Sequence, residues 1–140
     1  MKWLFKEEPD HYSYDELARD RKTVWSGVRN PLAQKHLRSV RKGDLVFYYH
    51  TGKEKAVVGI ARAISNPHPD PEEPSGSAVA VEVAPVRKLL HPVPLATIKA
   101  TRSLAGLPLV RLPRLSVMPI GDREWAEIEK LSEKTPKTSR

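Results

Sequence analysis

The residues best suited to chemistry lie in one short segment, WSGVRN, which runs from Trp25 to Asn30. Its indole could offer a flat apolar wall on which a nucleic-acid base stacks, an interaction worth about 1–3 kcal/mol per base. The amide of Asn30 carries a donor and an acceptor that could read a base edge, and Gly27 lets the backbone approach a ligand or adopt a positive φ. By residue type and spacing alone, however, the segment is a loop that leads into a capped helix, with basic residues downstream.

Two of these residues also have purely structural interpretations. A tryptophan in a small domain is more often a core aromatic, so the residues alone favour a core position for Trp25. Asn30 precedes Pro31, where a helix cap belongs, and capping alone would explain it. Both interpretations stay open for Asn30.

Several classes of enzyme lack their motifs. The chain has no cysteine, which excludes disulfides, thiol nucleophiles and thiolate metal sites. Its five histidines show no short metal-ligand spacing, and GxGxxG, GxxxxGK[ST] and GxSxG are absent. Glu7 and Glu8 are adjacent, which on a strand sends them to opposite faces instead of into a paired-carboxylate site. We expect no metal and no cofactor.

The charge balance favours an anionic partner. The net charge is +7 and the sequence pI is near 9.8, which raises the expectation of nucleic-acid binding. Basic residues cluster at Arg19, Arg21 and Lys22 and again at Arg29, Lys35, Arg38, Arg41 and Lys42. Such clusters fit a solvated surface and a phosphate-facing patch equally well. Residues 133–140 carry three basic residues and one acidic residue, and we expect a disordered basic tail there.

The first half of the chain predicts a strand followed by two short helices. Trp3–Lys6 is strand-like, and Pro9 ends that strand. Ser13 and Glu16 have the spacing of a capping box for a helix that reaches about Arg19. The next helix is expected to begin at Asn30-Pro31 and to bury Ala33, Leu37 and Val40, with Lys35 and Arg38 on its outer face.

The rest of the chain predicts long strands and a final helix. Strands are expected over Leu45–His50, Ala56–Ile64 and Ala78–Leu90, with an exposed proline-rich hairpin loop at 66–76 between the last two. A short helix over Leu95–Ala100, strand-like alternation within Leu109–Ile120 and a helix over Asp122–Leu131 follow. The pattern predicts a single α+β domain over residues 1–132, whose strands curl into a barrel or half-barrel flanked by helices.

Six segments in order connect the chain to a known family. WLFKEEP, WSGVRNPLAQKHLR, GDLVFYYH, VVGIAR, HPVPL and LVRLPRLSVMPI together resemble the EVE domain family, a branch of the PUA-like superfamily related to YTH and ASCH domains. The resemblance runs from Lys2 to about Leu131. Glu7 stands where the family usually has serine or threonine.

The resemblance implies a PUA-like β-barrel of about five to six mainly antiparallel strands, with a pocket that binds a modified base of DNA or RNA, flipped or single-stranded. It also makes a pocket position the favoured interpretation of Trp25. The implied pocket residues are Lys6, Trp25, Gly27, Val28, Arg29, Asn30, Tyr48, His50 and Ser116, and the implied phosphate contacts are Arg29, Lys35, Arg38 and Arg111. For His50 we favour a structural role, and for Ser116 a bond to nearby backbone stays open.

Three functions from different classes follow. We expect a nucleic-acid-binding module and not an enzyme. One alternative is a small amidohydrolase acting on modified nucleosides, with Lys6 and Glu8 as base and acid, although an exposed ion pair explains these two more simply. The other is a protein-partner scaffold with a vestigial pocket. No apolar run approaches the roughly 20 residues of a membrane span, so we expect a soluble, cytoplasmic protein, monomeric or weakly dimeric.

Overall fold

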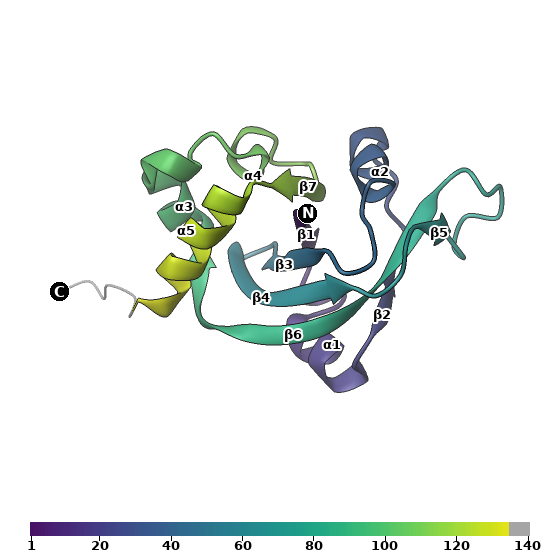
Figure 1. Ribbon diagram of the computed structural model, residues 1–140, viewed down its shortest axis with the longest axis horizontal. Coiled ribbons are helices and arrows are strands. Elements are labelled where there is room, and N and C mark those ends of the chain that lie inside the picture. The colour runs from purple at the N-terminus through teal and green to yellow at the C-terminus, as the bar shows by residue number, and fades with distance from the viewer. Residues whose placement is uncertain (135–140) are drawn as a thin grey trace.

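A single curled sheet forms the centre of the protein, whose computed structural model describes residues 1–134 (Figure 1). The sheet order is β2-β6-β4-β3-β1-β7, and the short β5 pairs with β6. The strands are β1 (Lys2–Glu7), β2 (Thr23–Trp25), β3 (Leu45–His50), β4 (Ala56–Ala63), β5 (His68–Pro69), β6 (Val79–Pro94) and β7 (Val117–Ile120). In the described residues every pair is antiparallel except β1 with β3. The predicted α+β half-barrel is confirmed.

The curvature of the sheet comes from its longest strand and from two irregularities. β6 spans 16 residues and pairs with β2, β4 and β5 in turn. Its register against β4 shifts between Val57 and Gly59 and between Ile60 and Ala61, and such bulges bend a strand. Gly59 is required because a Cβ there would lie 2.5 Å from Cε1 of Tyr14, whose ring covers the sheet at this point.

Helices close both sides of the sheet. They are α1 (Tyr14–Asp20), α2 (Pro31–Leu37), α3 (Leu95–Ala100), the 3-10 helix η1 (Arg102–Leu104), α4 (Pro108–Arg111) and α5 (Asp122–Glu133). The helices α3, α4 and α5 gather at one end of the sheet, whereas α2 and the loop around β5 lie toward the other (Figure 1). None of the helices in the described part of the chain has the length and apolarity that a membrane span requires.

The helix caps follow the predicted local chemistry. The Ser13 side chain accepts from the backbone N–H of Glu16, and the Glu16 side chain accepts from the N–H of Ser13, which confirms the capping box. Asn30 caps α2 through Oδ1, which accepts from the N–H of Ala33 at 3.0 Å. Ala33, Leu37 and Val40 are fully buried, as predicted.

Two predictions need correction. The strand-like alternation expected around Leu115, Ser116 and Val117 becomes a strand only from Val117 onward. Before it, Pro108 occupies the first turn of α4, where its missing N–H costs nothing. The loop 66–76 is not exposed throughout, because it contains β5 and the buried Asp70. Helix α5 continues to Glu133, one residue past the expected domain boundary, and residues 135–140 of the expected tail lie outside the described residues.

Candidate nucleic-acid interface

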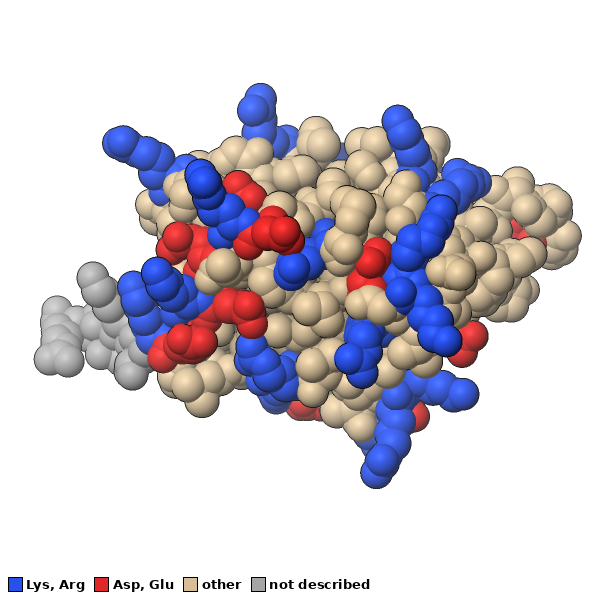
Figure 2. Space-filling model, in the orientation of Figure 1, with Lys and Arg blue, Asp and Glu red and all other residues tan. Residues whose placement is uncertain are grey.

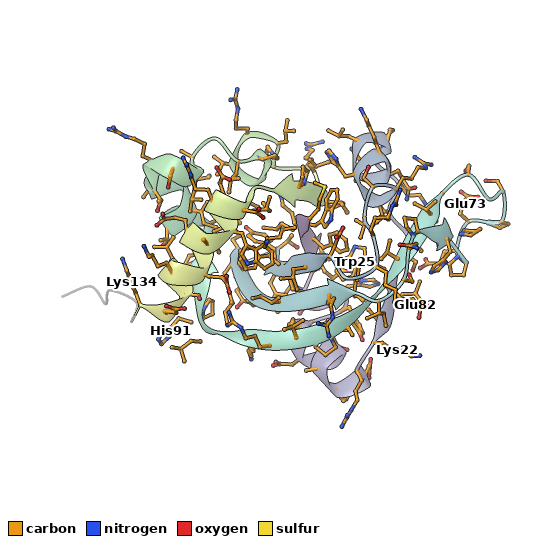
Figure 3. All side chains as sticks on the ribbon, in the orientation of Figure 1. Lys22, Trp25, Glu73, Glu82, His91 and Lys134 are labelled. Carbon is orange, nitrogen blue, oxygen red and sulfur yellow. The ribbon has the colours of Figure 1, made fainter. Side chains whose placement is uncertain are left out.

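A cavity of about 580 Å³ opens beside Trp25, a residue labelled in Figure 3. It lies where β1 and β2 end, between the 26–29 segment, the loop after β5 and the residue that precedes β7. Its lining comprises Lys6, Glu7, His11, Tyr12, Thr23, Val24, Trp25, Ser26, Gly27, Val28, Arg29, Glu72 and Ser116. The fold thus brings together six of the nine residues that the sequence suggested for a pocket, namely Lys6, Trp25, Gly27, Val28, Arg29 and Ser116.

Trp25 belongs to the core and to the cavity wall at once. It ends β2, opposite Val81 of β6, and is only 6% exposed. Its ring lies 5.2 Å from that of Phe5 and meets the Tyr48 ring edge to face at 5.3 Å. Because these rings cover much of the indole, its rim and not a whole face is available to a ligand.

The indole N–H of Trp25, a residue that lines the cavity, is unpaired in the described part of the chain. Among residues 1–134 it has no hydrogen-bond partner, whereas the indole of Trp3 donates to Asp44 at 2.9 Å. In this part of the chain, two side-chain polar atoms are fully buried and lack a hydrogen-bond partner, namely Thr51 Oγ1 and His68 Nε2. The indole nitrogen of Trp25 is not among them, so it is accessible to a ligand or water. Tryptophan can only donate, so the cavity wall presents a free donor at this point.

A buried carboxylate holds the segment after Trp25 in place. Gly27 has φ +75°, a conformation that favours glycine, and its N–H donates to Asp70 Oδ2 at 2.8 Å. Asp70 Oδ1 accepts from the N–H of Glu72 at 2.7 Å, and the Asp70 side chain is completely buried. Arg29 Nη1 lies 3.7 Å from the same carboxylate. Asp70 therefore ties the WSGVRN segment to the loop after β5.

Glu72 forms part of the cavity wall itself. Its Oε2 accepts a hydrogen bond from Ser26 Oγ, and Arg29 Nη2 reaches its backbone oxygen at 3.5 Å. Asp70 and Glu72 were both missed by the sequence reasoning, which treated HPDPEEP as an exposed loop. The available signal was Asp70 itself, which is flanked by prolines on both sides and so lies in a restricted backbone.

The cavity lining also includes Lys6, Glu7 and His11. Lys6 Nζ donates to the carbonyl of Pro113 at 2.8 Å, and burial lowers the pKa of Lys6. His11 Nδ1 lies 3.1 Å from Glu7 Oε2, and the hydrogen bond to Glu7 raises the pKa of His11. The expected ion pair between Lys6 and Glu8 does not form in the described residues, since β1 ends at Glu7 and Glu8 lies outside the cavity lining.

Three of the expected pocket residues do not line the cavity. Asn30 caps α2 and borders a separate hollow of about 330 Å³. Tyr48 is 1% exposed and donates to the carbonyl of Tyr12, and burial raises the pKa of Tyr48. His50 is also buried, its Nε2 accepting from the N–H of Tyr14 at 3.0 Å and its Nδ1 lying 2.7 Å from Glu54.

The four expected phosphate contacts are exposed but lie in different places. Arg29 is at the cavity, whereas Arg111 borders the hollow next to Asn30. Lys35 and Arg38 lie on α2 and just after it, and Arg38 Nη2 donates to the carbonyl of Ser77 at 2.8 Å. Figure 2 shows Lys and Arg side chains over the α2 and β2 side of the face in view, with fewer acidic side chains among them than at the opposite end. In residues 1–134 no group of three or more His, Asp or Glu side chains could hold a metal ion.

Comparisons with known proteins agree on one family. A model of the EVE domain matches residues 1–131. The chain is 30% identical to human thymocyte nuclear protein 1, over 96% of this chain and 75% of that protein. The solved structure of Rpa0253 from Rhodopseudomonas palustris has a TM-score of 0.90 and 39% identity, covering 94% of this chain and 92% of that one. The human THYN1 protein in complex with 5-methylcytosine containing DNA has a TM-score of 0.88 and 27% identity, covering 96% and 99%.

Proposed function

Since this chain belongs to the EVE domain family, we propose that it binds nucleic acid and takes a modified base into the cavity beside Trp25. A human relative of the same fold has been solved with DNA that contains 5-methylcytosine. The cavity, at about 580 Å³, falls within the usual range of small-molecule sites. A base that is turned out of its strand would fit inside it, at a cost of a few kcal/mol that is least where the strand is already single.

The charges of the lining favour a base over a phosphate inside the cavity. Lys6 and Arg29 contribute positive charge, but Glu7 and Glu72 contribute two carboxylates to the same cavity lining. A phosphate group would be repelled by both carboxylates at short range. A neutral base carries donors and acceptors on its edge and matches such a mixed lining. The phosphates would then lie outside, near Arg29, Lys35, Arg38 and Arg111, where they would supply affinity without sequence information.

The observation that carries the proposal is the open indole N–H of Trp25. An unpaired donor on a residue that is 6% exposed lowers stability unless a ligand or water meets it, and here it borders a cavity large enough for one. The enzyme alternative has less support. The ammonium of Lys6 is bonded to the Pro113 carbonyl and Glu8 is outside the cavity, so the acid and base of that alternative are not brought together.

Titration followed by NMR tests the proposal. The chain has three tryptophans and hence three indole N–H signals, and Trp25→Phe identifies the one of interest while keeping an aromatic ring against Phe5 and Tyr48. A single-stranded DNA with one 5-methylcytosine should shift the Trp25 signal. The signals of Trp3, bonded to Asp44, and of Trp125, stacked on Phe47, should stay in place and serve as internal controls. Binding that leaves the Trp25 signal unmoved would refute the cavity as the site.

A further inference from the structure

Glu72 is the carboxylate that the loop after β5 contributes to the cavity lining, and its main chain is anchored to neighbouring groups. Its N–H donates to buried Asp70 at 2.7 Å, and its carbonyl accepts from Arg29 at 3.5 Å. Its carboxylate lies over Gly27, where a Cβ would be 3.5 Å from Oε1. The side chain of Glu72 is itself exposed, and Ser26 is the residue that hydrogen-bonds to its carboxylate.

One oxygen of this carboxylate is free to accept. Ser26 donates to Oε2, and in the described residues Oε1 has no hydrogen-bond partner. The nearest guanidinium, that of Arg29, bonds to the backbone oxygen of Glu72 and lies beside Asp70. An ionised carboxylate can only accept hydrogen bonds, so a ligand group that meets Glu72 must be a hydrogen-bond donor.

The cavity thus combines an obligatory donor at Trp25 with an obligatory acceptor at Glu72. The Watson–Crick edge of cytosine pairs an acceptor, N3, with an exocyclic amino donor, and adenine pairs N1 with its amino group in the same way. Thymine presents the reverse, an N3–H donor and an O4 acceptor, so its oxygen would face the carboxylate and its N–H would face another N–H.

Resting on the proposed function, we infer that Glu72 determines specificity by accepting a hydrogen bond from the exocyclic amino group of the bound base, while Trp25 donates to the ring acceptor beside that group. The site therefore selects amino bases, that is cytosine or adenine derivatives, over keto bases. This selection depends on the Watson–Crick edge of the base and not on its modification. Other residues of the cavity lining would recognise the modification.

A pair of oligonucleotides isolates this edge. 5-Methylcytosine and thymine carry the same methyl group and differ only at ring position 3 and at the substituent of position 4. Single-stranded DNA with one or the other at a single central position is titrated into the full chain, and binding is followed by fluorescence anisotropy. The wild-type protein should prefer 5-methylcytosine by at least about tenfold, the discrimination expected from hydrogen bonds to a charged group.

Glu72→Gln should reduce that preference to within about twofold, because the amide replaces one acceptor oxygen with a donor that suits the O4 of thymine. Glu73→Gln is the matched control, since it removes the same charge from the next residue. Glu73 borders a different hollow, beside Arg38, and lies out on the loop between β5 and β6 (Figure 3). The preference of the Glu73→Gln protein for 5-methylcytosine over thymine should equal that of the wild type. Thermal unfolding verifies that both variants are folded.

The outcomes separate the inference from the proposed function. A Glu72→Gln protein that keeps the full preference, or a wild-type protein that binds both oligonucleotides equally while the Trp25 signal shifts, would overturn the role of Glu72 and leave the base-binding function standing. A wild-type protein that binds neither oligonucleotide would overturn both.

Discussion

The two ends of the curled sheet are built on different principles. The end covered by α3, α4 and α5 is apolar, with Ile98, Leu104, Leu109 and Ile128 at most 1% exposed and Trp125 lying flat on Phe47 at 3.6 Å. The cavity end carries charged groups in its wall, and its loops are connected through one buried carboxylate, Asp70. Apolar burial therefore stabilises the helical end, whereas a few directed hydrogen bonds shape the cavity end. Changes at the helical end should affect stability alone, whereas changes at the cavity end should affect binding as well.

The largest expected effect is at the helical end. Trp125→Ala removes the ring that stacks on Phe47 and leaves a void in a close-packed core. We expect the free energy of unfolding to fall by about 3–5 kcal/mol, measured by urea denaturation. The affinity of the folded protein for a 5-methylcytosine oligonucleotide should not change. A loss of affinity at a temperature where the variant is folded would contradict the separation of the two ends.

The next effect concerns Asp70, the link between the loops of the cavity end. Asp70→Ala leaves the N–H groups of Gly27 and Glu72 without their acceptor, which should reduce the free energy of unfolding by about 2–3 kcal/mol. Base binding should weaken as well, because Glu72 is no longer held at the wall. Asp70→Asn keeps one acceptor oxygen, so its free energy of unfolding and its affinity for the base should both fall by less. The exposed Asp10, replaced by alanine, provides the control and should change neither quantity.

The contrast between the ends also explains what could be predicted from the sequence. Local signals were sufficient for the fold: Ser13 and Glu16 predicted their capping box, and the strand over Leu45–His50 was predicted with its observed bounds. The cavity needed more than local signals. Asp70 lies 43 residues from Gly27, and no sequence pattern near either residue predicts their hydrogen bond.

The positions of the predicted pocket residues teach the same lesson. Trp25, Lys6 and Ser116 could be proposed together because the family resemblance supplied their proximity, and the fold does bring them to one cavity. Tyr48 and His50 lie on a strand next to β1, but their polar atoms bond to the backbone of Tyr12 and Tyr14 and to Glu54. Residue types on a strand do not reveal these partners, of which Tyr12 and Tyr14 lie 36 residues from Tyr48 and His50.

The smallest expected effect is a pH-dependent change in stability at His11, which lies at the cavity end. The pKa of His11 is raised, chiefly by its hydrogen bond to Glu7, so the folded protein binds this proton more tightly than the unfolded chain does. The stabilisation is therefore fully present below the ordinary value of 6.5 and is lost as the pH rises through the raised pKa. His11→Gln should be slightly less stable than the wild type at acidic pH and equal to it at alkaline pH, in urea unfolding measured across this range. The side chain of His11 is exposed, which keeps the difference small.

The stability deficit of Trp125→Ala provides the control, because no ionisable group causes it and it should stay constant over the same pH range. A deficit of His11→Gln that is equally constant would show that the pair with Glu7 contributes nothing to stability.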